Sequence, residues 1–219
     1  MSIAHRFADI QKSFRMKRMR RFISVFGLTA NRRVLDVGGT ADIWGLLPAS
    51  DAPSVVLLNM PRAEQGGASA QGLERVHGDG CYLPFADRSF DIVFSNSVIE
   101  HVGGAEAQAR FAREIMRTGR GYWVQTPHRY FPIETHLLTP FVHLLPRAWR
   151  AFIFRRFTVW QWIHRPDAEA KRYYIEHFVS DIRLLSAGQM QRLFPDAVIL
   201  RERFLGFTKS LIAYRLPKR

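Results

Sequence analysis

Two adjacent glycines follow an apolar run that contains an aspartate, in the stretch RVLDVGGTADIW at residues 33–44. Gly38 and Gly39 carry no Cβ, so a ligand can approach the backbone closely at this point. Ligands of open parallel sheets bind beyond the carboxyl ends of the strands. The stretch therefore predicts a nucleotide-type cofactor near Asp36, and a plain strand-to-helix turn remains the alternative.

The glycine spacing departs from both common phosphate-binding patterns. A dinucleotide fingerprint requires G-x-G-x-x-G, but Thr40 and Ile43 stand at the second and third glycine positions. A P-loop requires Gly-Lys-Ser/Thr, which the sequence does not contain. These residues alone therefore leave the identity of the cofactor open.

Four residues could take a proton from a reacting group, and they lie in the stretches IEHV and TPHRYFPIETH. Histidine and glutamate are common general bases. The candidate catalytic residues are His101, His128, Glu134 and His136. His101 and His128 each follow a predicted strand, so both belong to the same sheet edge. For any one of them, a structural or surface role is the alternative.

The elements that must position these residues follow an alternating pattern. Strand-like runs occur at 32–37, 54–59, 73–78, 89–96 and 119–126, and a helical pattern covers 104–118. Alternation of this kind predicts right-handed crossovers and a mostly parallel sheet.

The end of the chain has a different pattern. Residues 197–216 hold two strand runs joined at Leu205-Gly206-Phe207, with no room for a crossover helix, so they must pair antiparallel. A short helix at 186–194 precedes them, with Ser186 as its N-cap.

The order of three segments carries a family resemblance. They are VLDVGGT, the strand that ends at Asn59, and HGDGCYLPFADRSFDIVFSNSVIEHV. Together they resemble class I S-adenosylmethionine-dependent methyltransferases, most closely the type 11 branch, over about residues 30–126. The run from Asp79 to Val93 is the most specific part. The resemblance implies an α/β, Rossmann-like, mostly parallel seven-stranded sheet with an antiparallel C-terminal pair, and S-adenosyl-L-methionine as the cofactor.

The resemblance also assigns cofactor-binding roles. Asp36 and Gly38 correspond to the first motif, near the methionine part of the cofactor, and Gly39 and Thr40 continue that loop. The family's loop normally has further glycines, which Thr40 and Asp42 replace here.

Four more positions follow from the resemblance. Asn59 stands where the family has an acidic residue that holds the ribose hydroxyls, and Asp79 matches the residue that accepts from the adenine amino group. Asn96 and Ser97 are expected to face the cofactor and the methyl acceptor.

Some relatives hold a metal on E-x-x-E-H, but Ser97 replaces the first carboxylate, so no metal is expected.

Composition bears on compartment and partners. The chain has 219 residues, a formal net charge of +13 and one cysteine, Cys81, which excludes an internal disulfide. The charge favours polyanionic partners: a phosphorylated or lipid-linked acceptor, or peripheral contact with anionic membrane, and nucleic acid less so. No apolar run reaches the ~18 residues of a spanning helix. We therefore expect a cytoplasmic protein that contacts the inner face of the membrane.

One domain is expected over residues 1–219, with two additions to the sheet. Residues 1–30 form an amphipathic helix that carries Arg18, Arg20 and Arg21, and residues 127–180 form a helical lid or insertion rich in tryptophan. The predicted function is methyl transfer, with oxygen as the expected acceptor atom. The alternative is a catalytically degenerate relative that binds anionic membrane or RNA.

Overall fold

The fold is a seven-stranded sheet with helices on both faces. The computed structural model describes residues 3–45, 52–61, 73–134, 139–140 and 182–217. The sheet consists of β1 (Arg33–Val37), β2 (Ser54–Asn59), β3 (Leu73–His77), β4 (Phe90–Asn96), β5 (Gly119–Pro127), β8 (Val198–Phe204) and β9 (Phe207–Arg215). The described helices are α1 (Ile3–Phe26), α2 (Ala41–Trp44), α3 (Ala105–Thr118) and α7 (Ala187–Leu193).

The strand order is β3-β2-β1-β4-β5-β9-β8. The pairs from β3 to β5 are parallel, whereas β5 pairs with β9, and β9 with β8, antiparallel. These findings confirm the predicted fold, including the closing strand pair. Because β1 lies between β2 and β4, the strand order reverses at β1, and a ligand is expected beyond its carboxyl end.

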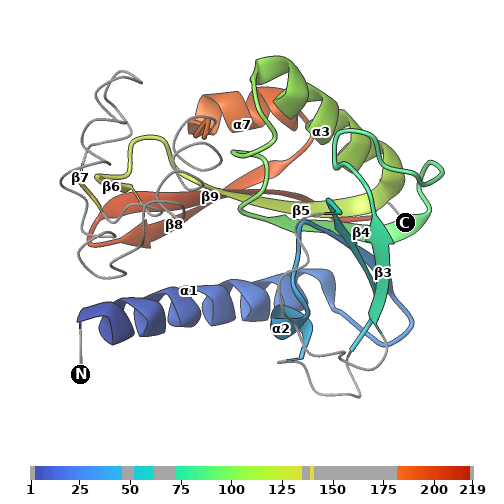
Figure 1. Cartoon of the computed structure of the whole chain (residues 1–219), viewed down its shortest axis with the longest axis horizontal. Coiled ribbons are helices and arrows are strands. Elements are labelled where there is room, and N and C mark those ends of the chain that lie inside the picture. The colour runs from blue at the N-terminus through green and yellow to red at the C-terminus, as the bar shows by residue number, and fades with distance from the viewer. Residues whose placement is uncertain (1–2, 46–51, 62–72, 135–138, 141–181, 218–219) are drawn as a thin grey trace.

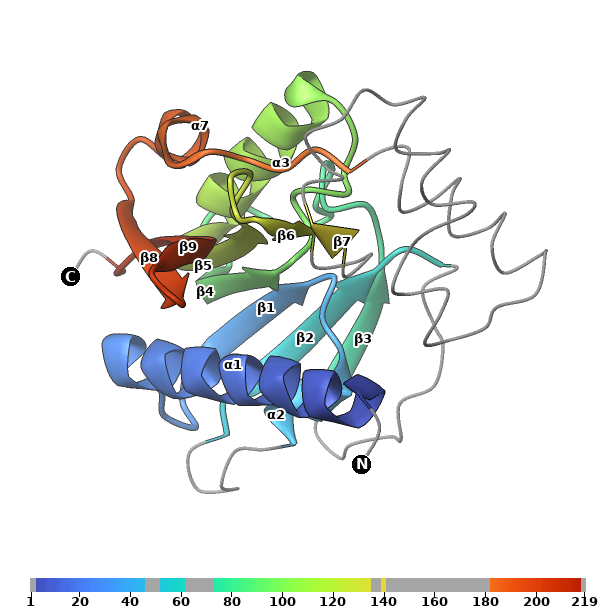
Figure 2. The same ribbon diagram turned by 90° about the vertical axis from the view of Figure 1, so that its left-hand side faces the viewer.

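Helices cover both faces of this sheet (Figures 1 and 2), so the core has two halves. On one side, α3 and α7 pack on residues such as Leu35, Val93 and Val124. On the other side, α1 and α2 pack on Val34, Ile92 and Trp123. Alternate residues of each strand therefore serve opposite halves, as the twofold period of a strand requires. Ser186 is the N-cap of α7, as predicted, and the structure adds a capping box with Gln189.

Helix α1 is held to the sheet by its apolar stripe. Met19, Phe22 and Phe26 are spaced at three and four residues and are all buried. The helix ends at Gly27, whose φ of +54° suits a helix C-terminus. Arg20 and Arg21 are exposed, but the expectation that Arg18 faces a membrane is wrong, because its side chain is buried in an ion pair with Glu202.

The described part of the predicted insertion contains a small antiparallel pair. Strand β6 (Ile133–Glu134) pairs with β7 (Thr139–Pro140). Residues 141–181, with Trp149, Trp160 and Trp162, lie outside the described residues, so the helical lid stays a prediction. Within the part of the chain that the structure describes, no helix is long and apolar enough to cross a membrane.

Candidate active site

The loop after β1 depends on Gly38. Its φ is +76°, and a Cβ there would lie 2.5 Å from Cγ2 of Val98. Its backbone N–H donates to the carbonyl of Leu58 over 2.8 Å, which ties the loop to β2. A side chain at this position would meet both backbone strain and a steric clash. The strand-to-helix turn and the exposed backbone face therefore both require glycine here.

Asp36 lies beneath this loop with its carboxyl group fully buried. Trp44 Nε1 donates to Oδ2 over 2.8 Å, and a Cβ on Gly39 would overlap the same carboxyl group. The other oxygen, Oδ1, is buried and accepts no hydrogen bond from the described residues. Burial raises the pKa of Asp36 to about 7, although the bond from Trp44 opposes the shift. A ligand that donates to Oδ1 would satisfy a costly unpaired acceptor.

Asn59 and Thr40 border the same loop. Asn59 Nδ2 donates to the carbonyl of Gly39 over 3.0 Å, while its amide oxygen accepts nothing from the described residues. That oxygen remains available for a ligand hydroxyl. Thr40 is exposed at the N-cap of α2, and its side chain makes no capping bond.

The turn after β3 presents Asp79. Asp79 Oδ1 accepts from the backbone N–H of Cys81 over 2.8 Å, and the Asp79 carbonyl accepts from Tyr82 over 2.9 Å. The side chain is exposed, so its second oxygen can meet a ligand. Gly80 is pressed against the core, since a Cβ there would lie 2.8 Å from Phe111 Cε2. Desolvation is the main cause that raises the pKa of the buried Cys81 thiol to about 11, which disfavours the thiolate form.

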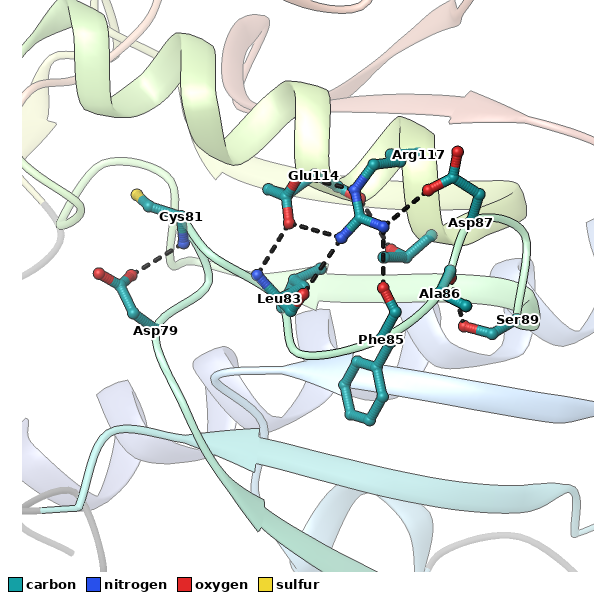
Figure 3. A network of polar contacts seen from close by, with 10 residues as sticks. Asp79, Cys81, Leu83, Phe85, Ala86, Asp87, Ser89, Glu114 and Arg117 are labelled. Atoms are coloured by element: carbon teal, nitrogen blue, oxygen red, sulfur yellow. Dashed lines mark hydrogen bonds and ion pairs between the residues drawn. The ribbon is translucent and has the colours of Figure 1, made fainter.

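Two residues of α3 clamp the loop that carries Asp79 (Figure 3). Glu114 accepts from the backbone N–H of Leu83 over 2.8 Å. Arg117 donates to the carbonyls of Leu83 and Phe85, at 3.1 and 2.8 Å, and pairs with Glu114 at 2.8 Å. The bonds from Arg117 lower the pKa of Glu114. Sequence reasoning missed this clamp, whose only signal was a Glu–Arg pair three residues apart in a predicted helix.

At the carboxyl ends of β4 and β5 a polar cluster faces α1. Arg18 donates to Oδ1 of Asn96 and, over 3.0 Å, to Oε1 of Gln125. Ser97, with a φ of +58°, donates to the same Gln125 oxygen over 2.9 Å. Asn96 and Ser97 thus lie at the predicted edge, but their side chains contact protein groups that the sequence did not predict.

The candidate bases are distributed along this edge. His128 is half-buried, its ring lies edge-on against Tyr130, and desolvation lowers its pKa, so the imidazole is neutral near pH 7. His101 is half-buried and follows the fully buried Glu100, which accepts from Thr126 Oγ1 over 3.0 Å.

The remaining two predicted bases are less well placed. The backbone of Glu134 lies in β6, but its side chain is not described, and His136 lies outside the described residues. Among the described residues, no three His, Cys, Asp or Glu side chains are grouped to hold a metal.

Comparisons with known proteins agree with this geometry. Residues 52–121 match the family model of a methyltransferase domain. That match confirms the resemblance and supports S-adenosylmethionine as the cofactor; it spans the chain from just before β2 into β5.

Solved structures share the fold at low sequence identity. A protein from Pyrococcus horikoshii matches with a TM-score of 0.58 and 14% identity, over 95% of this chain and 91% of that one. A chain from a complex of a methyltransferase with a methyltransferase activator of Haloferax volcanii matches with a TM-score of 0.52 and 14% identity, over 97% and 96%. Phosphoethanolamine N-methyltransferase 2 of Haemonchus contortus matches with a TM-score of 0.52 and 14% identity, over 84% of this chain and 38% of that one. At such identities these likenesses show the fold alone.

Proposed function

We propose that this chain is a class I methyltransferase of the type 11 branch and that it transfers the methyl group of S-adenosylmethionine to an oxygen of a small acceptor. The observation that carries the proposal is the buried Oδ1 of Asp36, beside Gly38 and Gly39, which has no hydrogen-bond partner among the described residues. A buried hydrogen-bond acceptor beneath a loop whose glycines carry no side chain fits a ligand that supplies a hydrogen-bond donor.

The residues of the edge fit the three parts of this cofactor. Asp36 would accept from the amino group of the methionine part, and ionisation of its carboxyl would strengthen that bond. The amide oxygen of Asn59, which accepts nothing from the described residues, would accept from one ribose hydroxyl, with a weaker hydrogen bond than a carboxylate makes. Asp79 would accept from the adenine amino group through its exposed second oxygen.

The reaction needs alignment more than it needs catalytic groups. S-adenosylmethionine supplies a methyl group that the positive sulfur already activates, so holding the two reactants in line lowers most of the barrier. His128 would take the proton of the acceptor hydroxyl as the carbon–oxygen bond forms and the carbon–sulfur bond breaks. Its lowered pKa keeps the imidazole in the basic form near neutral pH.

The acceptor in this proposal is a phosphorylated or lipid-linked small molecule. The formal net charge of +13 supports an anionic acceptor, because a positive surface raises the local concentration of anions.

Calorimetric titration with S-adenosylmethionine and S-adenosylhomocysteine tests the proposal. We expect saturable binding of both at one site. Absence of binding by a protein that is folded by circular dichroism contradicts the proposal.

One observation favours the alternative, a catalytically degenerate module that binds anionic membrane or RNA. The polar groups of the loop partly satisfy one another, since Trp44 donates to Asp36 and Asn59 donates to Gly39. Failure to bind the cofactor, together with salt-sensitive binding to anionic vesicles or RNA, would identify this alternative.

A further inference from the structure

A β-bulge in the closing hairpin redirects one lysine. Ser210 pairs with Glu202 and Thr208 pairs with Arg203, so Lys209 opposes no residue of β8. In a regular strand, Lys209 would point away from the face that Ser210 serves. Bulges re-aim side chains and are common next to active sites. Here the Lys209 ammonium nitrogen lies 3.5 Å from the ring centroid of Phe14 on α1.

The surroundings of this ammonium group are rich in positive charge. Glu202 is the carboxylate beside it, but that group accepts from two nitrogens of Arg18, at 3.0 and 2.6 Å, and from the hydroxyl of Ser210. Among the described residues, Lys209 makes no ion pair and donates no hydrogen bond beyond its contact with the Phe14 ring. Burial, together with the charges of Arg18 and Arg15, lowers the pKa of Lys209 to about 8, although Glu202 opposes the shift. A half-buried cation that has no anion of its own among the described residues is an unbalanced charge.

The lysine lies at the same edge as the predicted acceptor site. Ser210, its neighbour, pairs with Pro127 at the carboxyl end of β5. The Lys209 carbonyl accepts from the backbone N–H of His128 over 2.9 Å. Arg18 extends the cluster to Asn96 at the end of β4. The backbone of Lys209 is thus bonded to the backbone of the proposed base, and Arg18, whose charge acts on the ammonium group, reaches the end of β4.

We propose that Lys209, with the charges of Arg18 and Arg15 behind it, forms a subsite for a phosphate or carboxylate group of the methyl acceptor. An anion there would neutralise the excess charge and give the ammonium group the hydrogen-bond partners it lacks. The assignment of this anion to an acceptor rests on the proposed function, whereas anion binding at Lys209 does not.

The chain offers a direct measurement, because it has only five lysines: Lys12, Lys17, Lys171, Lys209 and Lys218. Reductive methylation with ¹³C-labelled formaldehyde gives each lysine its own NMR signal, and loss of one signal in Lys209→Met assigns Lys209. The probe is inorganic phosphate, compared with chloride at equal ionic strength. We expect phosphate to move the pKa of Lys209 from about 8 toward the ordinary lysine value of about 10.4.

The other lysines serve as controls in the same tube, above all the exposed Lys12. A phosphate response that is equal at Lys12 and Lys209, or the absence of any Lys209 response to both phosphate and acetate, overturns the subsite. A second titration uses acetate, and a shift of the Lys209 pKa with either phosphate or acetate, larger than that of Lys12, supports the subsite. A third arm uses phosphatidylglycerol vesicles. A Lys209 response to vesicles with none to phosphate or acetate would overturn the small-acceptor subsite and place Lys209 at a lipid surface.

The titrations need no cofactor, so their result is separate from that for the proposed function. If the protein binds phosphate at Lys209 but does not bind S-adenosylmethionine, the anion site is supported and the proposed function is contradicted. If the protein binds the cofactor but Lys209 does not respond to the anions, the proposed function is supported and the anion site is contradicted.

Discussion

At the residue scale, a substitution of Gly38 is the most direct test of the proposed cofactor site. Gly38→Val should weaken binding of S-adenosylmethionine at least tenfold, about 1.4 kcal/mol, because the side chain would clash with Val98 and block the loop. Calorimetry would measure this loss. Gly206→Val is the matched control, since Gly206 also has a positive φ, of +82°, but has open space around its Cβ position. Equal affinity in both variants would mean that the cofactor lies elsewhere.

Asp36 gives a second prediction at this scale, on pH. Its pKa rises from 3.8 to about 7 on folding, so the folded protein binds the extra proton between these values. The free energy of unfolding should therefore fall as pH rises from about 4 to about 7, because the buried carboxyl must then ionise. Asp36→Asn, which keeps an acceptor for Trp44, should flatten this fall. Urea denaturation at a series of pH values measures it, and parallel curves for the two proteins would refute the assignment.

Prediction from sequence succeeded for the position of single residues that lie at the ends of strands. Asp36 and Gly38 lie at the end of β1 and Asp79 follows β3, as the periodicity indicated, whereas their cofactor-binding roles stay a prediction. Asn96 was placed equally well, but its partner Arg18 lies 78 residues away, and no local pattern joins the two. The interactions of the site, unlike its location, depend on tertiary packing.

At the element scale, Glu114 and Arg117 of α3 should set the shape of the loop that carries Asp79. Arg117→Ala removes bonds to two carbonyls and two carboxylates, so we expect a loss of about 1–2 kcal/mol in stability and weaker cofactor binding. Chemical denaturation and calorimetry measure the two effects. Arg192→Ala, on the exposed face of α7, is the control. Arg117→Ala with unchanged cofactor affinity would show that the loop holds its shape without the clamp.

The contact between α1 and β8 provides another prediction at this scale. Arg18→Met should cost about 1–3 kcal/mol, because the partly buried Glu202 would lose its ion-pair partner and keep only the bond from Ser210 and the weaker attraction of Lys209. The double variant Arg18→Met/Glu202→Met should be less costly than Arg18→Met alone. Thermal melts of the single and double variants test this. Additive losses would mean that the pair is not coupled.

Whole strands and helices were easier to predict than their contacts. The run 54–59 was predicted with the observed ends, because a buried parallel strand is a continuous apolar segment. The Arg18–Glu202 pair spans 184 positions, and both residues have ordinary surface composition, so the sequence carried no sign of it. The sequence does not predict the bulge at Lys209 either, because a register shift does not change the alternation of residue types.

At the scale of the whole molecule, the positive charge should bring the protein to anionic membranes reversibly. With Arg18 buried, Arg20 and Arg21 are, with Arg15, the arginines of α1 whose described side chains are exposed, each contributing about 1 kcal/mol near an anionic surface. Arg20→Gln/Arg21→Gln should therefore reduce co-sedimentation with phosphatidylglycerol vesicles at low salt. Phosphatidylcholine vesicles are the control. Equal pelleting with both lipids would exclude an electrostatic contact.

The docking of α1 against the closing hairpin also has a consequence for the order of folding during synthesis. Phe22 packs against Phe94 of β4 and Trp123 of β5, and Arg18 pairs with Glu202 of β8, so α1 completes its contacts only when these later strands have been translated. Until β4 and β5 have been translated, the apolar stripe of α1 lacks these partners. Contacts of such high sequence separation slow folding and prolong the exposure of apolar surface. The nascent chain should therefore depend on chaperones that shield an early amphipathic helix, and ribosome-bound intermediates shorter than about 200 residues should be sensitive to proteases within α1.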